Sequence, residues 1–473
     1  MTGELQDQLV SRRDALRRAG CGFGHTALLG MLTQMGFLGL GAGAADAASG
    51  TKRTKGLHFG ARARNVIFLF LHGGVSHVDT FDPKPKLTEM DGKALPFDRP
   101  LQFDETGNLM KSPWAFRRYG QSGLPVSDLF PHVGSVVDEI AFIRSMHVEQ
   151  VDHGGAILQL NTGSAVFPRP SLGSWVVYGL GTENQNLPGF VSLSPPTIHG
   201  AKQNYGSAFL PAAHQGTPIG AANVPMSAAT IAHLQSGDKR QRARLDFIQE
   251  ANRKQVQTVT SDSRLEARIK SFELAFRMQM EAPEILDLAG ESPSTLASYG
   301  VGGDPTDNFG RQCLLARRFV ERGIRFVQCS HSYKWDQHGG LQGGHTRNAL
   351  EVDQPIAALI RDLKQRGLLD STLVVFGTEF GRTPVSQNGD GRDHNPYGFT
   401  LWLAGGGVKG GTVYGATDDF GYFAVENKVS MYDFHATLLH LLGIDHERLT
   451  YRHAGRDFRL TDVHGQVVHD IIA

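Results

Sequence analysis

Residues 373–395 read LVVFGTEFGRTPVSQNGDGRDHN, and this stretch decides the fold that we predict. It opens with a short apolar, β-prone run over 373–376, which is typical of a fully buried strand. Polar residues then follow in a glycine-rich loop, namely Glu379, Arg382, Asp393 and His394. Ligands of parallel α/β sheets bind at the carboxyl ends of the strands, because the loops there converge on one crevice. The stretch therefore predicts a buried strand with a functional loop directly after it.

The same pattern occurs three more times along the chain. Apolar strand candidates lie at 65–71, 140–146 and 323–329, and histidine and acidic residues follow each of them. These are His72, Ser76, His77, Asp79 and Asp82 after the first, His147, Glu149, Asp152 and His153 after the second, and His331, Asp336 and His338 after the third. Four such strands are hard to attribute to chance in a chain with 20 histidines. The simplest geometry that uses all four is one sheet with one site at its edge.

Helical patterns alternate with these strands. We expect helices over 126–137, 155–160, 168–177, 309–322, 347–364 and 431–442, and further strands over 189–193 and 399–404. The charged segment at 238–280 is predicted to form a solvent-facing helical pair. Residues 82–127 are predicted to form a long surface excursion, and residues 195–226 are predicted to form loops near the mouth of any site. Strands and helices that alternate at this spacing predict an α/β protein with a mostly parallel central sheet.

The N-terminal residues have the pattern of an export signal. Paired arginines at 12–13 and 17–18 precede an Ala/Gly/Leu-rich segment, 23–48, that ends in small residues. This layout is typical of a twin-arginine signal, although an uncleaved anchor or a basic start without function would also fit. We predict a signal over 1–48, a lead-in over 49–64 and one α/β domain over 65–473. The twin-arginine machinery would then deliver the protein to the periplasm or the cell exterior.

The balanced charge of the chain makes a nucleic-acid partner unexpected, and its length and cysteine count bear on the state of the thiols. The 47 Lys and Arg residues equal the 47 Asp and Glu residues, so no global charge favours nucleic acid, and we expect no nucleic-acid partner. Beyond the predicted signal, Cys313 and Cys329 are the cysteines of the chain. Because a chain of this length can bury a large core, we expect both thiols to be buried as small apolar residues rather than paired.

The polar residues after the strands are candidates for a metal site. Asp336 and His338 offer a carboxylate and an imidazole that suit zinc or a harder divalent ion, although a loop carboxylate bonded to a histidine would give the same pattern. Arg382 suits an anionic group, or neutralises Glu379 in a structural pair. His153 follows Asp152 at the start of a predicted helix, whose amide groups favour an anion.

Several motifs together resemble one known family. They are FLHGGVSHVDTFDPKP at 70–85, LQLNTG at 158–163, NLPGFVSL at 186–193, GTEFGRTP at 377–384, GRDHN at 391–395 and LGIDHERLTYRHAGRDFRLTD at 442–462. The set resembles the exported bacterial domain-of-unknown-function 1501 family, which is similar to a divergent branch of the alkaline phosphatase and sulfatase superfamily. The resemblance implies a three-layer α/β/α fold, and a hydrolase-like protein that binds a divalent metal, either zinc, calcium, magnesium or manganese.

The resemblance also implies roles for particular residues. The implied metal ligands are His72, Asp79, Asp336, His338, Glu379 and His394, and the implied catalytic residues are Asp152, His153 and Arg382. His153 stands where this superfamily has its Ser, Thr or Cys nucleophile, and Phe380 stands where it has a metal-binding histidine. We therefore expect metal-activated water to attack a phosphate or sulfate ester, with His153 as a ligand or a general base.

Two other interpretations stay open. In the first, a non-catalytic member of the fold binds an anionic glycan or a protein partner through the same loops. In the second, Ser76 or Ser145 is a nucleophile, although neither lies in the strand-turn-helix setting that such serines usually have. For the enzyme we expect a small anionic ester or a sulfated or phosphorylated glycan as the substrate.

Overall fold

The structure is a computed structural model that describes residues 56–98, 100, 106–184, 186–229, 247, 250 and 284–473. The predicted signal at 1–48, and the predicted helical pair at 238–280 apart from residues 247 and 250, lie outside the described residues. The export signal and the helical pair therefore stay predictions. Among the helices that the structure describes, none combines the length and the apolar character needed to span a membrane.

A nine-stranded sheet forms the centre of the fold. Its strands are β1 (Asn65–Leu71), β4 (Ile140–His147), β5 (Phe190–Leu193), β6 (Thr217–Ile219), β7 (Phe326–His331), β8 (Thr372–Gly377), β11 (Phe399–Ala404), β12 (Thr412–Tyr414) and β15 (Val429–Ser430). Their order is β12-β4-β11-β8-β1-β7-β5-β6, and β15 also pairs with β4. β1 pairs in parallel with β7 and β8, whereas β11 runs antiparallel to β8 and β4. The prediction of a mostly parallel sheet is confirmed.

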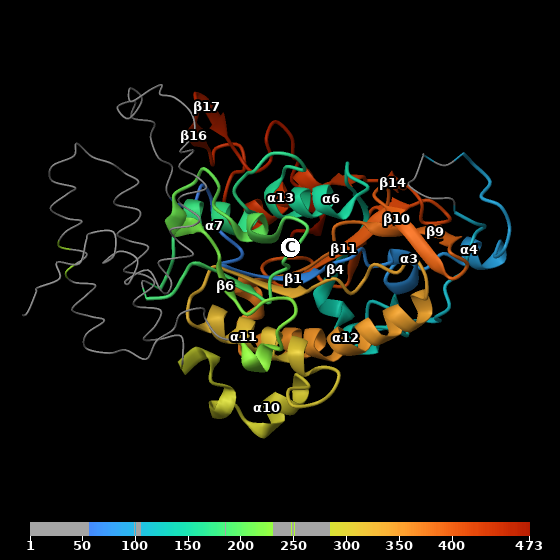
Figure 1. The fold of residues 1–473 in the computed structure, drawn as a ribbon, viewed down its shortest axis with the longest axis horizontal. Helices are drawn as coiled ribbons and strands as arrows, with labels where there is room; N and C mark the ends of the chain where they lie inside the picture. The colour runs from blue at the N-terminus through green and yellow to red at the C-terminus, as the bar shows by residue number, and fades with distance from the viewer. Residues whose placement is uncertain are drawn as a thin grey trace, which may run out of the picture.

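Helices cover both faces of this sheet (Figure 1). One face carries α6 (His153–Thr162), α7 (Leu172–Leu180) and α13 (Met431–Leu441), and the other carries α11 (Asp307–Glu321) and α12 (Leu341–Gln365). The short helices α5 (Pro131–Gly134) and α10 (Pro293–Ser298) pack against α12. Alternate side chains of β1 pack into two different cores, because successive strand residues point to opposite faces. Leu69 packs with α11 and α12, and Phe68 packs with α6, α7 and α13. The fold is therefore the predicted three-layer α/β/α arrangement.

The segment after β8 is not the open loop that we predicted. It forms an antiparallel hairpin of β9 (Gly381–Gln387) and β10 (Gly391–Asn395), and most of its residues are buried. Asn388 and Gly389 make the turn, with φ of 50° and 88°. An Asn-Gly pair favours such backbone angles and is a strong hairpin signal. This signal is present in the sequence, and our prediction missed it.

Two predicted helices differ most from the structure. The expected helix over 126–137 is wrong, since this region holds the end of β3 (Leu124–Ser127), the single turn α5 and a 3-10 turn at Val137–Glu139. Pro131 starts α5 because it has no amide hydrogen to donate into a preceding turn, and Asp353 of α12 accepts hydrogen bonds from the amides of the next two residues. α12 begins six residues before its predicted start.

Short elements complete the chain. They are the helices α3 (His77–Thr80) and α4 (Pro85–Glu89), the hairpin of β2 (Phe116–Tyr119) with β3, and the pairs β13 (Ala416–Thr417) with β14 (Ala424–Glu426) and β16 (Tyr451–His453) with β17 (Arg456–Phe458).

Cys313 and Cys329 are free and buried, as we expected.

The C-terminal end of α6 gives a test of the packing of this layer. Gly163 ends α6 with φ of 68°, and a Cβ atom there would lie 2.2 Å from the carbonyl oxygen of Leu460. Gly367 has the same φ but open space around it. We expect Gly367→Ala to cost about 1 kcal/mol from backbone strain, and Gly163→Ala to cost about 1–3 kcal/mol more from overpacking. Urea unfolding of both variants measures the difference, and equal losses would contradict this packing.

Candidate metal centre

The carboxyl ends of β1, β4, β7 and β8 meet at one edge of the sheet. His72 directly follows β1, and His153 is the first residue of α6, which follows β4. Asp336 and His338 lie after β7, and Glu379 lies after β8. The β9–β10 hairpin adds His394 from β10. The convergence of four loops at one sheet edge, which the sequence predicted, is present in the structure.

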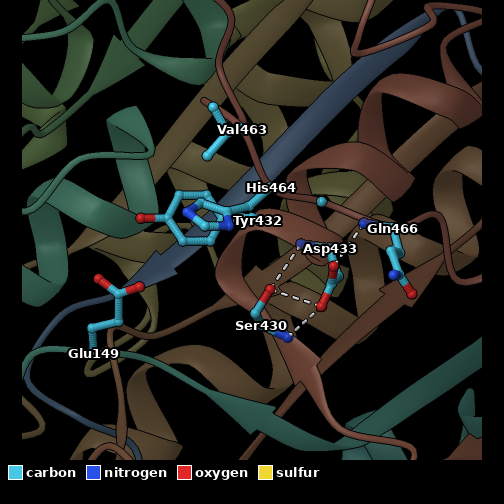
Figure 2. A pocket seen from close by; sticks show the side chains of 8 residues that line it. Glu149, Ser430, Tyr432, Asp433, Val463, His464 and Gln466 are labelled. Atoms are coloured by element: carbon cyan, nitrogen blue, oxygen red, sulfur yellow. Dashed lines mark hydrogen bonds between the residues drawn. The ribbon is translucent and has the colours of Figure 1, made fainter.

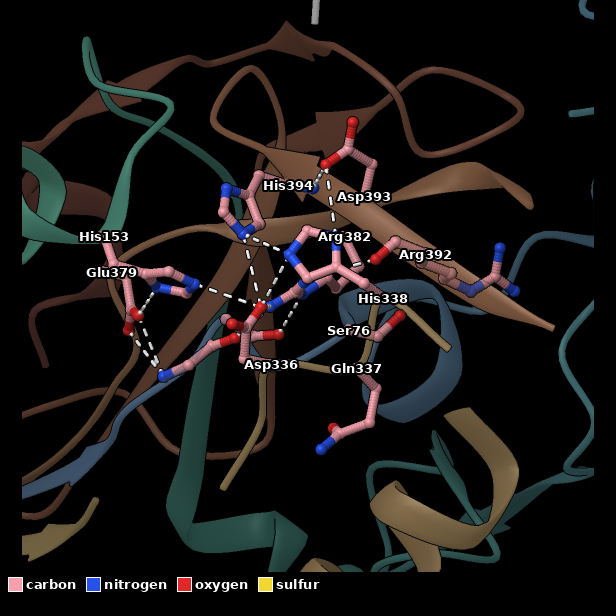
Figure 3. A network of polar contacts seen from close by, with 12 residues as sticks. Ser76, His153, Asp336, Gln337, His338, Glu379, Arg382, Arg392, Asp393 and His394 are labelled. Atoms are coloured by element: carbon pink, nitrogen blue, oxygen red, sulfur yellow. Dashed lines mark hydrogen bonds and ion pairs between the residues drawn. The ribbon is translucent and has the colours of Figure 1, made fainter. Parts of the chain in front are cut away.

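Four of these side chains point to a common centre (Figure 3). Asp336 Oδ1 lies 3.0 Å from His338 Nε2, 3.2 Å from His153 Nε2 and 3.4 Å from His394 Nε2. The Nε2 atoms of His338 and His394 are 3.0 Å apart. Donors at about 2.0–2.1 Å from a tetrahedral zinc ion lie roughly 3.3 Å from one another. These four pairs of donors are thus close to the spacing around a zinc ion, and all four donor atoms lie within 4.8 Å of one another.

The other ring nitrogen of each histidine is held by an oxygen acceptor. His153 Nδ1 lies 2.6 Å from Glu379 Oε1, His338 Nδ1 lies 2.5 Å from Gln387 Oε1, and His394 Nδ1 lies 2.7 Å from the carbonyl oxygen of Val151. Because these oxygens only accept hydrogen bonds, Nδ1 carries the proton in each ring. With a metal ion bound, the Nε2 lone pairs would face the centre, and such acceptors behind the rings are typical of histidines that bind metals.

Asp336 and its neighbours are strongly coupled. Burial raises the pKa of Asp336, but hydrogen bonds from His153, His338 and His394 outweigh it and hold this pKa far below its ordinary value. Burial lowers the pKa of His153, but hydrogen bonds with Asp336 and Glu379 outweigh it and raise this pKa to about 9. Without a cation His153 therefore carries a proton on both nitrogens between two carboxylates. A metal ion would take the place of the Nε2 proton.

Arg382 orients Asp336 from behind. The buried guanidinium donates to Asp336 Oδ1 at 2.6 Å, to the carbonyl oxygens of Gly74 and Arg392 at 3.0 Å, and to the carbonyl of Gly73. Its donors are thus used inside the protein, which corrects our expectation that Arg382 faces an anionic ligand. The open side of the centre is formed by Asp336 and His338, whose side chains are 41% and 33% exposed.

Glu379 and His72 form a second group with His153, and their ligand atoms lie within 4.8 Å of one another. Both oxygens of Glu379 already accept from the amide of Gly73, at 2.9 and 3.2 Å, and Oε1 also accepts from His153. Burial raises the pKa of Glu379, but its contacts with His153 and His72 lower it to about 2. The ionised carboxylate is therefore positioned to hold His153 from behind the centre.

Besides Arg382, the predicted site residues Asp79 and Asp152 lie outside both groups of candidate ligands. Asp79 is fully buried and pairs with Arg392 at 2.7 and 3.1 Å, and Ser76 Oγ donates to it at 2.5 Å. Its carboxylate is used to neutralise a buried guanidinium, so the structure does not bring it to the centre. Asp152 caps α6 by accepting from the amide of Gly155 at 2.9 Å.

The two serines that we considered as nucleophiles are also engaged elsewhere. Ser76 donates to Asp79, and Ser145 Oγ donates to the carbonyl oxygen of Asn427. His331, which precedes the Asp336 loop, bonds to Glu351 and accepts from Trp335 instead of facing the centre. None of these three side chains belongs to either group of candidate ligands among the described residues.

Sequence reasoning missed two residues next to the centre. Gln387 holds His338, and His199 lies 3.1 Å from His72. A glutamine on a strand carries no signal of its own, although recognition of the hairpin would have placed Gln387 beside the centre. His199 belongs to the 195–226 region that we predicted near the mouth of a site, but one histidine in a glycine- and proline-rich segment does not reveal its contacts.

Comparisons with known proteins support the resemblance seen in the sequence. The sequence model of the family described as "Protein of unknown function (DUF1501)" matches residues 63–472. The chain belongs to this family. No curated protein sequence matches the chain significantly.

Solved structures that are similar to this DUF1501 protein have low sequence identity. They include the PsFucS1 sulfatase from Pseudoalteromonas sp., with 14% identity over 82% of this chain and 69% of that chain and a TM-score of 0.35. The lipoteichoic acid synthase LtaP from Listeria monocytogenes has 11% identity over 86% and 78%, with a TM-score of 0.37. The alkaline phosphatase from the Antarctic bacterium TAB5 has 10% identity over 76% and 96%, with a TM-score of 0.30.

A separate surface cavity of about 500 Å³ lies at the N-terminal end of α13 (Figure 2). It is lined by Glu149, Ser430, Tyr432, Asp433, Val463, His464, Gly465 and Gln466. Ser430 and Asp433 form the capping box that starts α13, so their polar groups already have partners. No candidate metal ligand lines this cavity, and we do not assign it to the centre.

The Asp79–Arg392 pair can be tested against the centre. Asp79→Asn would leave the buried Arg392 without its counter-charge, so we expect a loss of about 3–5 kcal/mol in the free energy of unfolding. Bound metal should be unchanged, because Asp79 lies outside the group of four ligands. Asp336→Asn should show the opposite pattern: the protein should lose its bound metal, and its free energy of unfolding should fall by less than that of Asp79→Asn. Elemental analysis and urea unfolding decide this, and a folded Asp79→Asn protein without metal would contradict the assignment.

The acceptor behind His338 gives a second test. Gln387→Leu removes the oxygen that fixes the His338 ring, so zinc affinity should fall by about 10–100-fold while the four ligands stay in place. Gln354→Leu on α12 is a matched control, because its amide bonds only to carbonyl groups near the end of α10. Competition with a zinc-binding dye measures both affinities. Equal affinity in the two variants would show that Gln387 does not support the centre.

Proposed function

We propose that this DUF1501 protein is a zinc-dependent hydrolase of phosphate or sulfate esters. The observation that carries the proposal is the convergence of three imidazole Nε2 atoms and one carboxylate at donor spacing. Calcium and magnesium prefer oxygen ligands, whereas imidazole with one carboxylate suits zinc. Catalytic zinc sites keep a coordination position for water or substrate, whereas four protein ligands close a tetrahedral site. The proposal therefore requires a fifth position, or release of one donor, on the exposed side formed by Asp336 and His338.

The residues around the centre support an anionic substrate and attack by water. α6 begins at His153, so the positive end of its backbone dipole lies at the centre and favours an anionic group. A bound zinc ion would supply Lewis acidity and would lower the pKa of a water molecule. Arg382 keeps Asp336 in place, and Glu379 keeps His153 in place. The hydroxyls of Ser76 and Ser145 are engaged elsewhere, so water is the nucleophile that we propose.

The rival function is binding without chemistry. One observation favours this function: His153 occupies the position at which the resemblance places a hydroxyl or thiol nucleophile. In this case the centre would hold a structural metal, and the loops would bind an anionic glycan or a protein partner. The two functions differ in whether the zinc-loaded protein turns over an ester.

We also propose that the substrate is met outside the cytoplasm. The twin-arginine pattern at 1–48 supports this location, because such signals export folded proteins, often with a metal already bound. A small phosphate or sulfate ester, or a sulfated or phosphorylated glycan, is the substrate class that this location and the centre accommodate.

Turnover of chromogenic esters tests the proposal. Zinc-loaded protein should hydrolyse 4-nitrophenyl phosphate or 4-nitrophenyl sulfate, and a chelator should abolish the activity. Asp336→Ala with His338→Ala should lower kcat/KM by at least about 100-fold, because two ligands are lost. His132→Gln, which removes an exposed histidine from α5, is the control and should keep full activity. Zinc-loaded protein that cleaves neither ester would favour the binding function.

A further inference from the structure

His199 lies beside the metal centre on the loop that follows β5. Its Nδ1 atom is 3.1 Å from His72 Nε2, and its ring stacks against that of His153 at a centroid distance of 5.4 Å and an interplanar angle of 15°. It is partly exposed, unlike His72, which is buried. His199 therefore forms part of the wall of the centre without belonging to either group of candidate ligands.

The backbone at His199 adopts a conformation that non-glycine residues rarely take. Its φ is 50°, and that of the neighbouring Tyr333 is 59°. Such conformations cost of order 1–3 kcal/mol each and persist where the surroundings hold them. The Tyr333 hydroxyl accepts from the amides of Thr197 and Ile198 at 2.8 and 2.5 Å, and Asn204 Nδ2 donates to the carbonyl of His199 at 3.1 Å. The loop is thus pinned on both sides of a strained histidine, which is characteristic of functional positions.

The buried His72 fixes the proton position on His199. His72 Nδ1 is buried and has no hydrogen-bond partner. A proton there would be an orphaned buried N–H group, and such donors are rarer in native structures than acceptors with an unused lone pair. We therefore assign the His72 proton to Nε2, from which it is donated to His199 Nδ1. In this assignment His199 carries its own proton on Nε2 and offers an N–H donor there.

We propose that His199 is an anion-binding residue of the centre, which donates Nε2–H to a phosphate or sulfate oxygen. His72 is the positioning residue that fixes its tautomer, and Tyr333 is the positioning residue that holds its loop. This inference rests on the proposed function, since it places the anionic end of the ester between the metal and His199. It predicts that substrates are selected by their oxyanion group.

Binding of inorganic phosphate and sulfate tests the inference without any need for turnover. Isothermal titration of the zinc-loaded full chain should show binding of at least one of the two anions. His199→Ala should weaken this binding by about tenfold, which is the effect of one hydrogen bond to a charged group. His199→Gln keeps a side-chain N–H donor and should recover part of the affinity. His132→Gln is the matched control, and zinc content should be the same in all four proteins.

The outcomes separate this inference from the proposed function. Unchanged phosphate and sulfate affinity in zinc-loaded His199→Ala overturns the inference, even if the protein hydrolyses esters. Loss of zinc in His199→Ala also overturns it, since His199 would then be a ligand. Wild-type protein that binds neither anion at millimolar concentration has the same consequence. Anion binding that depends on His199, without hydrolysis of any ester, leaves the inference standing and contradicts only the proposed function.

Discussion

The orientation of three imidazole rings is the constraint on which the centre depends. Each ring has one nitrogen tied to an oxygen acceptor, so the other nitrogen faces Asp336. The three acceptors come from different parts of the chain: a carboxylate after β8, a side chain on β9 and a backbone carbonyl just before α6. A centre of this kind is only as precise as the positions of these elements relative to one another. The parallel strands provide that precision, because they are buried on both faces.

Buried guanidinium groups fix the hairpin that carries His394. Arg382 on β9 bonds to the carbonyls of Gly73 and Gly74 after β1, and Arg392 on β10 pairs with Asp79. Burial of two guanidinium groups is costly unless their donors are paired, and here the contacts with Gly73, Gly74 and Asp79 join the hairpin to the segment after β1. These polar contacts tie the hairpin to the segment after β1, and Val385 of β9 adds apolar packing against Val78 and Leu87.

Much of the fold could be read from the sequence, because its signals are local. The strands β1 and β11 have the bounds that the sequence predicted, 65–71 and 399–404, because a strand buried on both faces is apolar throughout. The candidate ligands Asp336 and His338 could be found because they follow such a strand, and His394 could be found because it lies in the GRDHN motif at 391–395. The roles of Asp79 and Arg382 could not, because they depend on partners about 300 residues away or on contacts inside the hairpin. His199 was missed for the same reason.

X-ray absorption spectroscopy of the zinc-loaded protein tests the central claim most directly. The technique counts imidazole ligands from multiple scattering and measures the mean ligand distance. The account predicts stoichiometric zinc bound by three imidazole nitrogens, with oxygen completing the coordination at about 2.0–2.1 Å. A spectrum with fewer than two imidazoles, or a protein that takes up no zinc, would contradict it. In that case the three rings would be held for a purpose other than metal binding.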